Sequence, residues 1–247
     1  MGHIVGNRKI KLDPKRIESI ISLPAPRDKK AVKRFVGMAQ FCRNFVPGLN
    51  VHLSPLFNLL KNNTPFIWDV NCQKAFNYVK NLLSTAPILR TPSLHEEFIL
   101  ETDASNNGVG VCLKFIDKAS KKEHVIGYGS HKFTESELNW DITEKECFAI
   151  IYALRHYRHF LLGTKFKIKV DNRVVGYLKS KNDLKSRKLL NWAMELNEYD
   201  YQIIHIPSKN NQMSDCLSRV TSIQSDDIIG GVSLRDLLRE QHADKEE

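Results

Sequence analysis

The chain has 247 residues, a formal net charge of +9 and 42% hydrophobic residues. This length and composition are those of a globular chain, and they exclude a protein that is disordered over most of its sequence. The five cysteines are scattered without a C-x-x-C spacing, which argues against a zinc module or a disulfide framework. No apolar run approaches the ~18 residues of a membrane span, and the first residues show no secretory signal pattern. We therefore expect an intracellular protein, cytoplasmic or nuclear and not secreted, without membrane contact.

The positive charge is concentrated at the front of the chain. Residues 1–95 contain 15 Lys and Arg against 4 Asp and Glu, whereas residues 96–247 contain 22 against 24. A basic segment of this kind is typical of an element that binds a polyanion, although a solvated basic face would give the same count. Charge alone leaves both interpretations open.

The first 90 residues are predicted to form a hairpin and short helices separated by prolines. Apolar residues on both sides of a Gly6-Asn7 turn predict the β-hairpin. Asp13 followed by Pro14 is typical of a helix start, with Asp13 as the N-cap. Amphipathic patterns predict further helices over residues 28–46, 53–61 and 71–84, with lysines and arginines on the outer faces.

From residue 98 the pattern alternates with a period of two. Three strands in a meander are predicted first, then a long helix that ends at Gly163, and then a strand, a helix, a strand and a short helix. The order of elements is therefore β-β-β-α-β-α-β-α, which is an α/β pattern. The ranges are 98–103, 108–116 and 124–133 for the meander, and 142–162, 165–171, 186–199, 201–206 and 211–219 for the later elements.

Four acidic residues fall at the ends of these elements: Asp103, Glu146, Asp171 and Asp215. Each has an ordinary structural explanation. Asp103 would cap the turn that follows it, Thr143 and Glu146 form a capping-box pattern in the first helical turn, and the other two open polar helix starts. Together, however, four carboxylates at one end of a sheet would repel one another and need cations. Two Mg²⁺ ions roughly 3.5–4 Å apart would meet this need and suit an in-line displacement at a phosphate.

Four motifs, "TDAS", "TEKECFAIIYALRHYRHFLLG", "VDN" and "NNQMSDCLSR", make residues 98–219 resemble the ribonuclease H domain of gypsy-type LTR-retrotransposon Pol polyproteins. Residues 2–48 resemble the end of the reverse-transcriptase palm and the thumb, and residues 66–89 resemble its connecting region. The resemblance implies a ribonuclease H-like mixed five-stranded sheet with flanking helices, preceded by a small, mostly helical domain. It divides the chain into the end of the palm, the thumb and the connection (1–92), the ribonuclease H-like domain (93–220) and an acidic tail or linker (221–247).

The resemblance also implies a set of catalytic residues that bind two ions, Mg²⁺ or alternatively Mn²⁺. Asp103 would be shared by both ions, and Asp215 would hold the ion that activates water. Glu146 and Asp171 would hold the other ion. We prefer Glu146 to Glu144 because it directly precedes the apolar "CFAI" run, and we expect Glu144 to be a first-turn partner of the helix dipole.

Two further polar residues have less certain roles. His205 stands ten residues before Asp215, where retroviral ribonuclease H domains have a histidine that assists proton transfer or product release. It is also explained as the polar face of an alternating strand. Glu101 matches no motif of the family, and we expect it to be a charge at a strand edge.

The activity that the resemblance implies is metal-dependent cleavage of the RNA strand of an RNA–DNA hybrid. The partners would be the hybrid and the remainder of a reverse transcriptase whose chain continues before residue 1. No polymerase activity is expected, because the only Asp-Asp pair, Asp226-Asp227, lies in the tail and not in a Tyr-x-Asp-Asp turn. The alternative is a catalytically inactive or host-adopted module that binds nucleic acid or a protein partner. Its signature would be the loss of one of the four acids, and all four are present.

Overall fold

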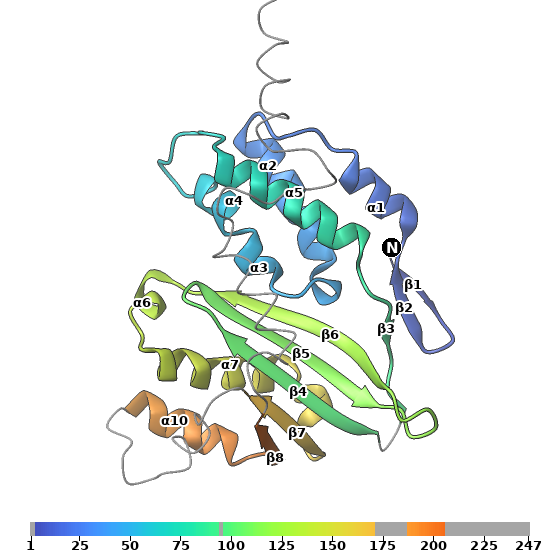
Figure 1. The fold of residues 1–247 in the computed structure, drawn as a ribbon. Coiled ribbons are helices and arrows are strands. Elements are labelled where there is room, and N and C mark those ends of the chain that lie inside the picture. Colours follow the sequence, from blue (N-terminus) through green and yellow to red (C-terminus); the bar gives the residue numbers. More distant parts are fainter. Residues whose placement is uncertain (1–2, 94–95, 171–186, 206–247) are drawn as a thin grey trace, which may run out of the picture.

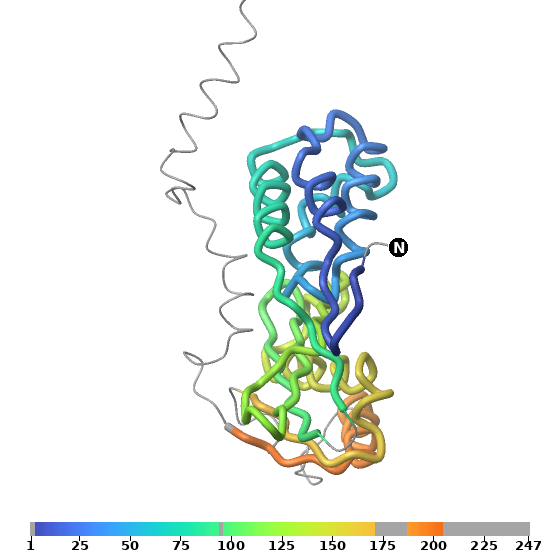
Figure 2. Tube along the Cα trace, turned by 90° about the vertical axis from the view of Figure 1, so that its right-hand side faces the viewer, coloured from blue at the N-terminus to red at the C-terminus, as the bar shows by residue number. Residues whose placement is uncertain are grey.

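The computed structural model describes residues 3–93, 96–170 and 187–205. Two units are stacked along one long axis, with the helices of the front unit at one end and a five-stranded sheet at the other (Figures 1 and 2). Asp171 and Asp215 lie outside the described residues, and so do the expected last helix and the acidic tail. None of the described helices is long and apolar enough to cross a membrane.

The front unit begins with the predicted hairpin. Its turn consists of Asn7 and Arg8, with φ angles of 49° and 57°, while Gly6 belongs to the first strand. The expected Gly6-Asn7 turn is therefore wrong by one residue. The strands instead turn at Asn7-Arg8, where positive φ at both positions gives a two-residue turn that matches the twist of the paired strands. The three strands of this sheet are β1 (His3–Gly6), β2 (Lys9–Leu12) and β3 (Leu89–Arg90).

Aspartate side chains cap three helices of the front unit. Asp13 accepts a hydrogen bond from the Lys15 N–H (3.0 Å), which confirms the predicted helix start. Asp28 and Asp69 cap the second and fifth helices in the same way. The helices are α1 (Pro14–Ile21), α2 (Lys29–Phe41), α3 (Leu49–His52), α4 (Ser54–Leu59) and α5 (Val70–Ser84), with the 3₁₀ turn η1 (Arg43–Phe45) after α2.

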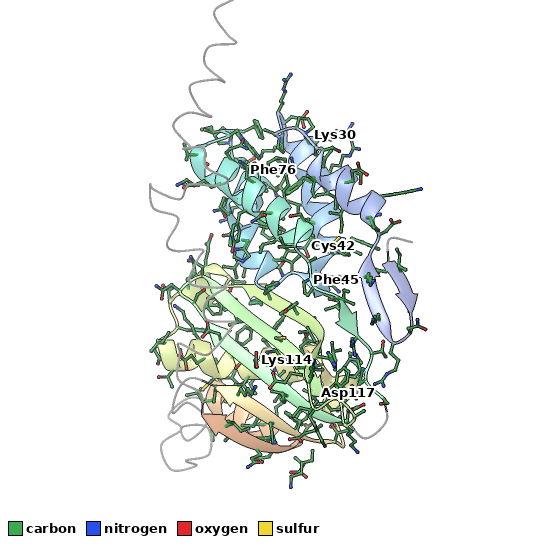
Figure 3. All side chains as sticks on the ribbon, turned by 45° about the vertical axis from the view of Figure 1, so that its right-hand side comes forward. Lys30, Cys42, Phe45, Phe76, Lys114 and Asp117 are labelled. Carbon is green, nitrogen blue, oxygen red and sulfur yellow. The ribbon has the colours of Figure 1, made fainter. Side chains whose placement is uncertain are left out.

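The apolar faces of these helices form one core. The rings of Phe35 and Phe76 are buried with their centroids 4.5 Å apart. Figure 3 shows Phe76, Cys42 and Phe45 inside the helical unit, with Lys30 at its outer end. Burying rings of this size is the main stabilising contribution that so small a unit has available.

The second unit is built on a mixed sheet in the order β6-β5-β4-β7-β8. The first three strands form the predicted antiparallel meander, and the last two run parallel to β4. This confirms the α/β fold with a mixed five-stranded sheet and flanking helices. The strands are β4 (Glu97–Ala104), β5 (Gly108–Ile116), β6 (Glu123–Lys132), β7 (Lys165–Val170) and β8 (Asp200–His205).

One long helix covers the apolar face of this sheet, and it ends earlier than the sequence predicts. The helix α7 stops at His156, and Tyr157 lies outside helical geometry with its hydroxyl donating to the Gly127 carbonyl oxygen at 2.7 Å. This buried tyrosine links the break to β6, and the following short helix ends before Gly163, where φ is +74°. The helices of this unit are α6 (Glu135–Leu138), α7 (Ile142–His156), α8 (Arg158–Leu161) and α10 (Arg187–Leu196).

The two units meet along β6 and the start of β5. The Asn50 backbone N–H donates to Ser130 Oγ (2.9 Å), and the Asn50 side chain donates to the Ser130 carbonyl oxygen (2.6 Å). At Gly108 an added Cβ would lie 2.3 Å from the His131 carbonyl oxygen and 2.8 Å from Val51 Cγ2, so only glycine fits under α3. The domain boundaries expected at residues 92 and 220 remain predictions.

Candidate active site

Asp103 is the last residue but one of β4 and is half-buried. The turn after it is closed by Ser105, whose Oγ donates to the Gly108 carbonyl oxygen (3.0 Å) and accepts from the Asn107 N–H (3.2 Å). The turn therefore has a capping side chain other than Asp103. Asp103 itself stands at the end of a strand that is otherwise largely buried.

Glu146 lies in the second turn of α7, not in the first. The N-cap of this helix is Asp141, whose Oδ1 accepts from the Glu144 N–H at 2.7 Å. Thr143 is thus inside the helix, and the capping-box explanation of Glu146 is wrong. Glu144 is in the first turn as predicted, where it also pairs with Lys188 at 2.8 Å.

Asp103 and Glu146 line the same small pocket, of about 10 Å³, between the end of β4 and α7. Val170, the last residue of β7, lines it too, because the parallel register pairs Glu101 with Lys169 and brings the ends of the two strands together. The fold therefore brings together two of the four predicted carboxylates. The other lining residues are Thr102, Ala104, Ala149 and Ile150.

The predicted small-residue stripe of α7 explains how the helix comes so close to the sheet. Ala149 and Ala153 are buried against it, and their size allows a close approach of the helix backbone. Between them and Glu146 lies Cys147, whose thiol pKa is raised to about 12 by burial and by the Glu146 carboxylate. The high pKa keeps this thiol protonated at neutral pH, so it is not a thiolate nucleophile.

The remaining predicted site residues fall at the limit of the described chain. Asp171 directly follows Val170, and it lies outside the described residues together with Asp215, so their grouping with Asp103 stays a prediction. His205 is the last residue of β8, and its backbone is paired in register with Val170, at the same end of the sheet as the pocket. Within the described ranges, no group of three or more His, Cys, Asp or Glu residues is arranged to hold a metal ion.

Glu101 is not the strand-edge charge that the sequence suggested. It is 4% exposed, and its carboxylate lies 2.8 Å from Lys114 Nζ and 3.3 Å from Lys169 Nζ. Glu123 completes the group at 2.8 Å from Lys169. The group occupies the sheet face opposite α7, where Figure 3 shows Lys114. A sequence signal for this role existed but was missed. The lysines of β7 alternate along the strand, and in the parallel register Lys169 lies beside Glu101 of β4.

The comparisons with known proteins agree with this architecture. Residues 68–168 match the family described as the RNase H-like domain found in reverse transcriptase. The chain is 33% identical over 232 residues to the retrovirus-related Pol polyprotein from transposon 412 of Drosophila melanogaster, which covers 94% of this chain and 18% of that protein. It is 31% identical over 207 residues to the transposon Tf2-3 polyprotein of Schizosaccharomyces pombe, covering 83% and 16%.

A solved structure of similar fold is the foamy viral protease-reverse transcriptase in complex with an RNA/DNA hybrid. It has a TM-score of 0.67 and 19% sequence identity, and the match covers 83% of this chain and 28% of that one. The chain thus spans about a fifth or less of the length of the curated relatives named above. Residues 68–168 thus match the RNase H-like domain found in reverse transcriptase, and most of the chain is similar to one segment of the Pol polyproteins of retrotransposons.

Proposed function

We propose that the chain is the ribonuclease H part of a retrotransposon reverse transcriptase and cleaves the RNA strand of an RNA–DNA hybrid. The observation that carries this proposal is the shared pocket of Asp103 and Glu146 at the end of β4. Two half-buried carboxylates from separate elements meet there, next to the ends of β7 and β8. The family match supports the same activity, and the foamy viral enzyme of similar fold was solved with an RNA/DNA hybrid.

The donor set fits a hard divalent cation. Carboxylate oxygens are the ligands that Mg²⁺ and Mn²⁺ take from proteins, and Asp103 and Glu146 both line the pocket. We infer that Asp103 and Glu146 hold the ions, together with Asp171 and Asp215 as the resemblance implies. When bound, two such ions would supply an activated water and stabilise the leaving oxygen.

The residues of the chain would position the reaction. Asp103 on β4 and Glu146 on α7 belong to rigid elements, so their carboxylates are fixed before the substrate binds. His205, at the same end of the sheet, would transfer a proton to or from the reacting oxygens. The basic front unit would hold the hybrid through its phosphates, while RNA 2′-hydroxyls near the cut would distinguish the strand to be cleaved.

The first test compares two glutamates of one helix. Glu146→Gln and Asp103→Asn are expected to lower cleavage of a labelled hybrid by about 10³-fold, which corresponds to about 4 kcal/mol of transition-state stabilisation. Hybrid binding should change by less than about threefold. Glu144→Gln is the matched control, because Glu144 lies on the same helix outside the pocket and should retain activity.

The same assay with EDTA, Mg²⁺ and Mn²⁺ tests the metal. The hybrid should be cleaved only when one of the two ions is present. Duplex DNA should not be cleaved under any of these conditions. Full activity of Asp103→Asn would overturn the assignment of the site. Hybrid binding without cleavage under every condition would instead support the alternative, a catalytically inactive or host-adopted module.

A further inference from the structure

A second and larger pocket lies between the helices of the front unit and the β4–β5 turn. Its volume is about 460 Å³, which is within the range of small-molecule sites. Its walls come from α3, α4, α5, the segment between α4 and α5, and the turn that follows Asp103 (Figure 1). The polar and aromatic residues used below are His52, Asn58, Asp69, Asn71, Tyr78 and Asn107.

His52 lines this pocket but is itself buried. The residue is 4% exposed, and Nε2 is shielded from solvent, with no hydrogen-bond partner among the described residues. Burial lowers the pKa of His52 to about 4, so the ring is neutral at pH 7. The pocket is therefore bordered by an uncharged ring on this side.

The other walls combine an aromatic ring with amide groups. The ring of Tyr78 meets His52 edge to face, with centroids 4.8 Å apart. Asn71 and Asn107 are exposed at the pocket and carry both donors and acceptors, and the Asp69 carboxylate adds acceptors. A ligand that suits these walls is planar and has N–H donors beside acceptors on its edge. Nucleobases have this combination.

Positive charge lies beside the same pocket. Lys74 lines it, and Lys132 Nζ donates to Asn58 Oδ1 at 3.1 Å. Lys61 follows the helix that forms one wall. A ring for stacking, surrounded by lysines, is the arrangement that binds an unpaired base together with its backbone phosphates.

We propose that this pocket takes an unpaired nucleobase from the nucleic-acid strand that the chain binds. Asn107 connects the two sites, because it lines this pocket and lies four residues after Asp103. A base that leaves the duplex near the cleavage site would be held here, stacked on Tyr78 and with its edge hydrogen-bonded to Asn71 and Asn107. This base-pocket proposal rests on the proposed function in one respect, namely that the bound polymer is an RNA–DNA hybrid.

The experiment measures binding of the full chain in EDTA, so that cleavage does not enter. The probe is an RNA–DNA hybrid with one unpaired 2-aminopurine nucleotide, and the reference is the same hybrid with an abasic nucleotide at that position. The unpaired base should strengthen binding about tenfold, since stacking a base on an aromatic side chain contributes about 1–3 kcal/mol. Fluorescence of the 2-aminopurine reports its environment directly.

Three variants make the test specific. Tyr78→Leu removes the aromatic ring on which the base would stack and keeps an apolar side chain, and it should abolish the preference for the base. Asn71→Ala should weaken the preference, whereas Asn81→Ala, an equally exposed asparagine of α5 outside the pocket, should leave it unchanged. Cleavage of a fully paired hybrid should be the same in all three.

Three results would overturn the proposal. The first is equal binding of the base-bearing and abasic probes by the unmodified chain. The second is a preference that survives both Tyr78→Leu and Asn71→Ala. The third is displacement of the probe by adenosine monophosphate at the affinity of the hybrid itself, which would assign the pocket to a free nucleotide and not to a bound strand. If the unmodified chain prefers the unpaired base but does not cleave the paired hybrid, the proposed nuclease function is contradicted and the base pocket is not.

Discussion

Glu101 lies only two residues before Asp103 on β4, but its surroundings give it a different role. Its carboxylate is buried between two lysines, so its charge is already balanced within the sheet. Asp103 and Glu146 instead line a small pocket at the sheet end, between β4 and α7. Acidic residues in a similar sequence context can thus have different roles. The surroundings that the fold provides decide whether each one is a structural ion-pair partner or a candidate catalytic residue.

Replacing Glu101 with glutamine should destabilise the sheet strongly. The change leaves the buried ammonium of Lys114 without its nearest counter-ion, which in comparable buried pairs costs about 3–5 kcal/mol. Urea unfolding followed by circular dichroism measures the loss. Glu123→Gln is the control, because its side chain is 40% exposed and its removal should cost less than about 1 kcal/mol. Equal costs for the two variants would contradict this account.

His52 should make the chain sensitive to acid. Its pKa is about 4 in the folded chain, against 6.5 for an ordinary histidine, so the unfolded chain takes up a proton first as pH falls. The free energy of unfolding should therefore fall between about pH 6.5 and pH 4, by about 3 kcal/mol from this residue, and level off below. His52→Gln should lose this part of the pH dependence in urea unfolding at pH 7, 5.5 and 4. An unchanged slope in that variant would show that other groups cause it.

At the scale of the elements, the start of α7 determines where Glu146 stands. Asp141 caps the helix and places Glu146 in the second turn, where Ala149 lets the helix lie close to β4. A helix that began one turn later would lose the ordered backbone around Glu146. The cap therefore influences the candidate site without contacting it.

Asp141→Ala and Thr143→Ala should separate the observed cap from the one that the sequence suggested. The first change removes the side chain that accepts from the Glu144 N–H and should cost about 1 kcal/mol. It should also lower hybrid cleavage modestly. Thr143 is inside the helix, so its replacement should change stability by less than about 0.5 kcal/mol. The midpoint of urea unfolding gives both values, and the reverse order would favour the capping box at Thr143.

Sequence patterns predicted most of these elements because their signals are local. The Asp13-Pro14 start and the alternation of β7 both depend on neighbouring residues, and both are confirmed. The break at Tyr157 depends on a hydrogen bond to β6, and the role of Glu101 depends on lysines from two other strands. Such contacts between distant segments are not visible in periodicity. Asp103 and Glu146 were predicted from their positions at the ends of elements, and their assignment to one site came from the resemblance. The small pocket is consistent with that grouping only in that both residues line it.

At the scale of the whole molecule, the basic charge belongs to the front unit and the candidate site belongs to the other. The two units are joined by the Asn50–Ser130 hydrogen bonds and by the close contact of α3 at Gly108. Under the proposed function, a hybrid held by one unit and cut by the other would depend on this junction for its alignment. Binding and cleavage should therefore respond to different changes.

Hybrid binding should weaken steeply with salt. If the front unit contacts about six phosphates, affinity should fall about 10³-fold between 50 and 200 mM salt, because each contact releases condensed counter-ions. Lys33→Gln and Arg34→Gln on α2, both exposed, should reduce the slope of log affinity against log salt by about one each if they contact phosphates. A slope near zero in the unmodified chain would exclude electrostatic binding by this unit.

The junction along β6 has a consequence for shortening the chain. Val125 and Tyr128 on this strand pack against the core of the front unit, whereas Ile126 packs against the core of the sheet. A chain cut at residue 93 would leave the first pair uncovered, together with the glycine at position 108 that α3 normally shields. The sheet unit expressed by itself would thus expose an apolar strip to water and should tend to aggregate. A cut placed before residue 3 keeps that strip covered.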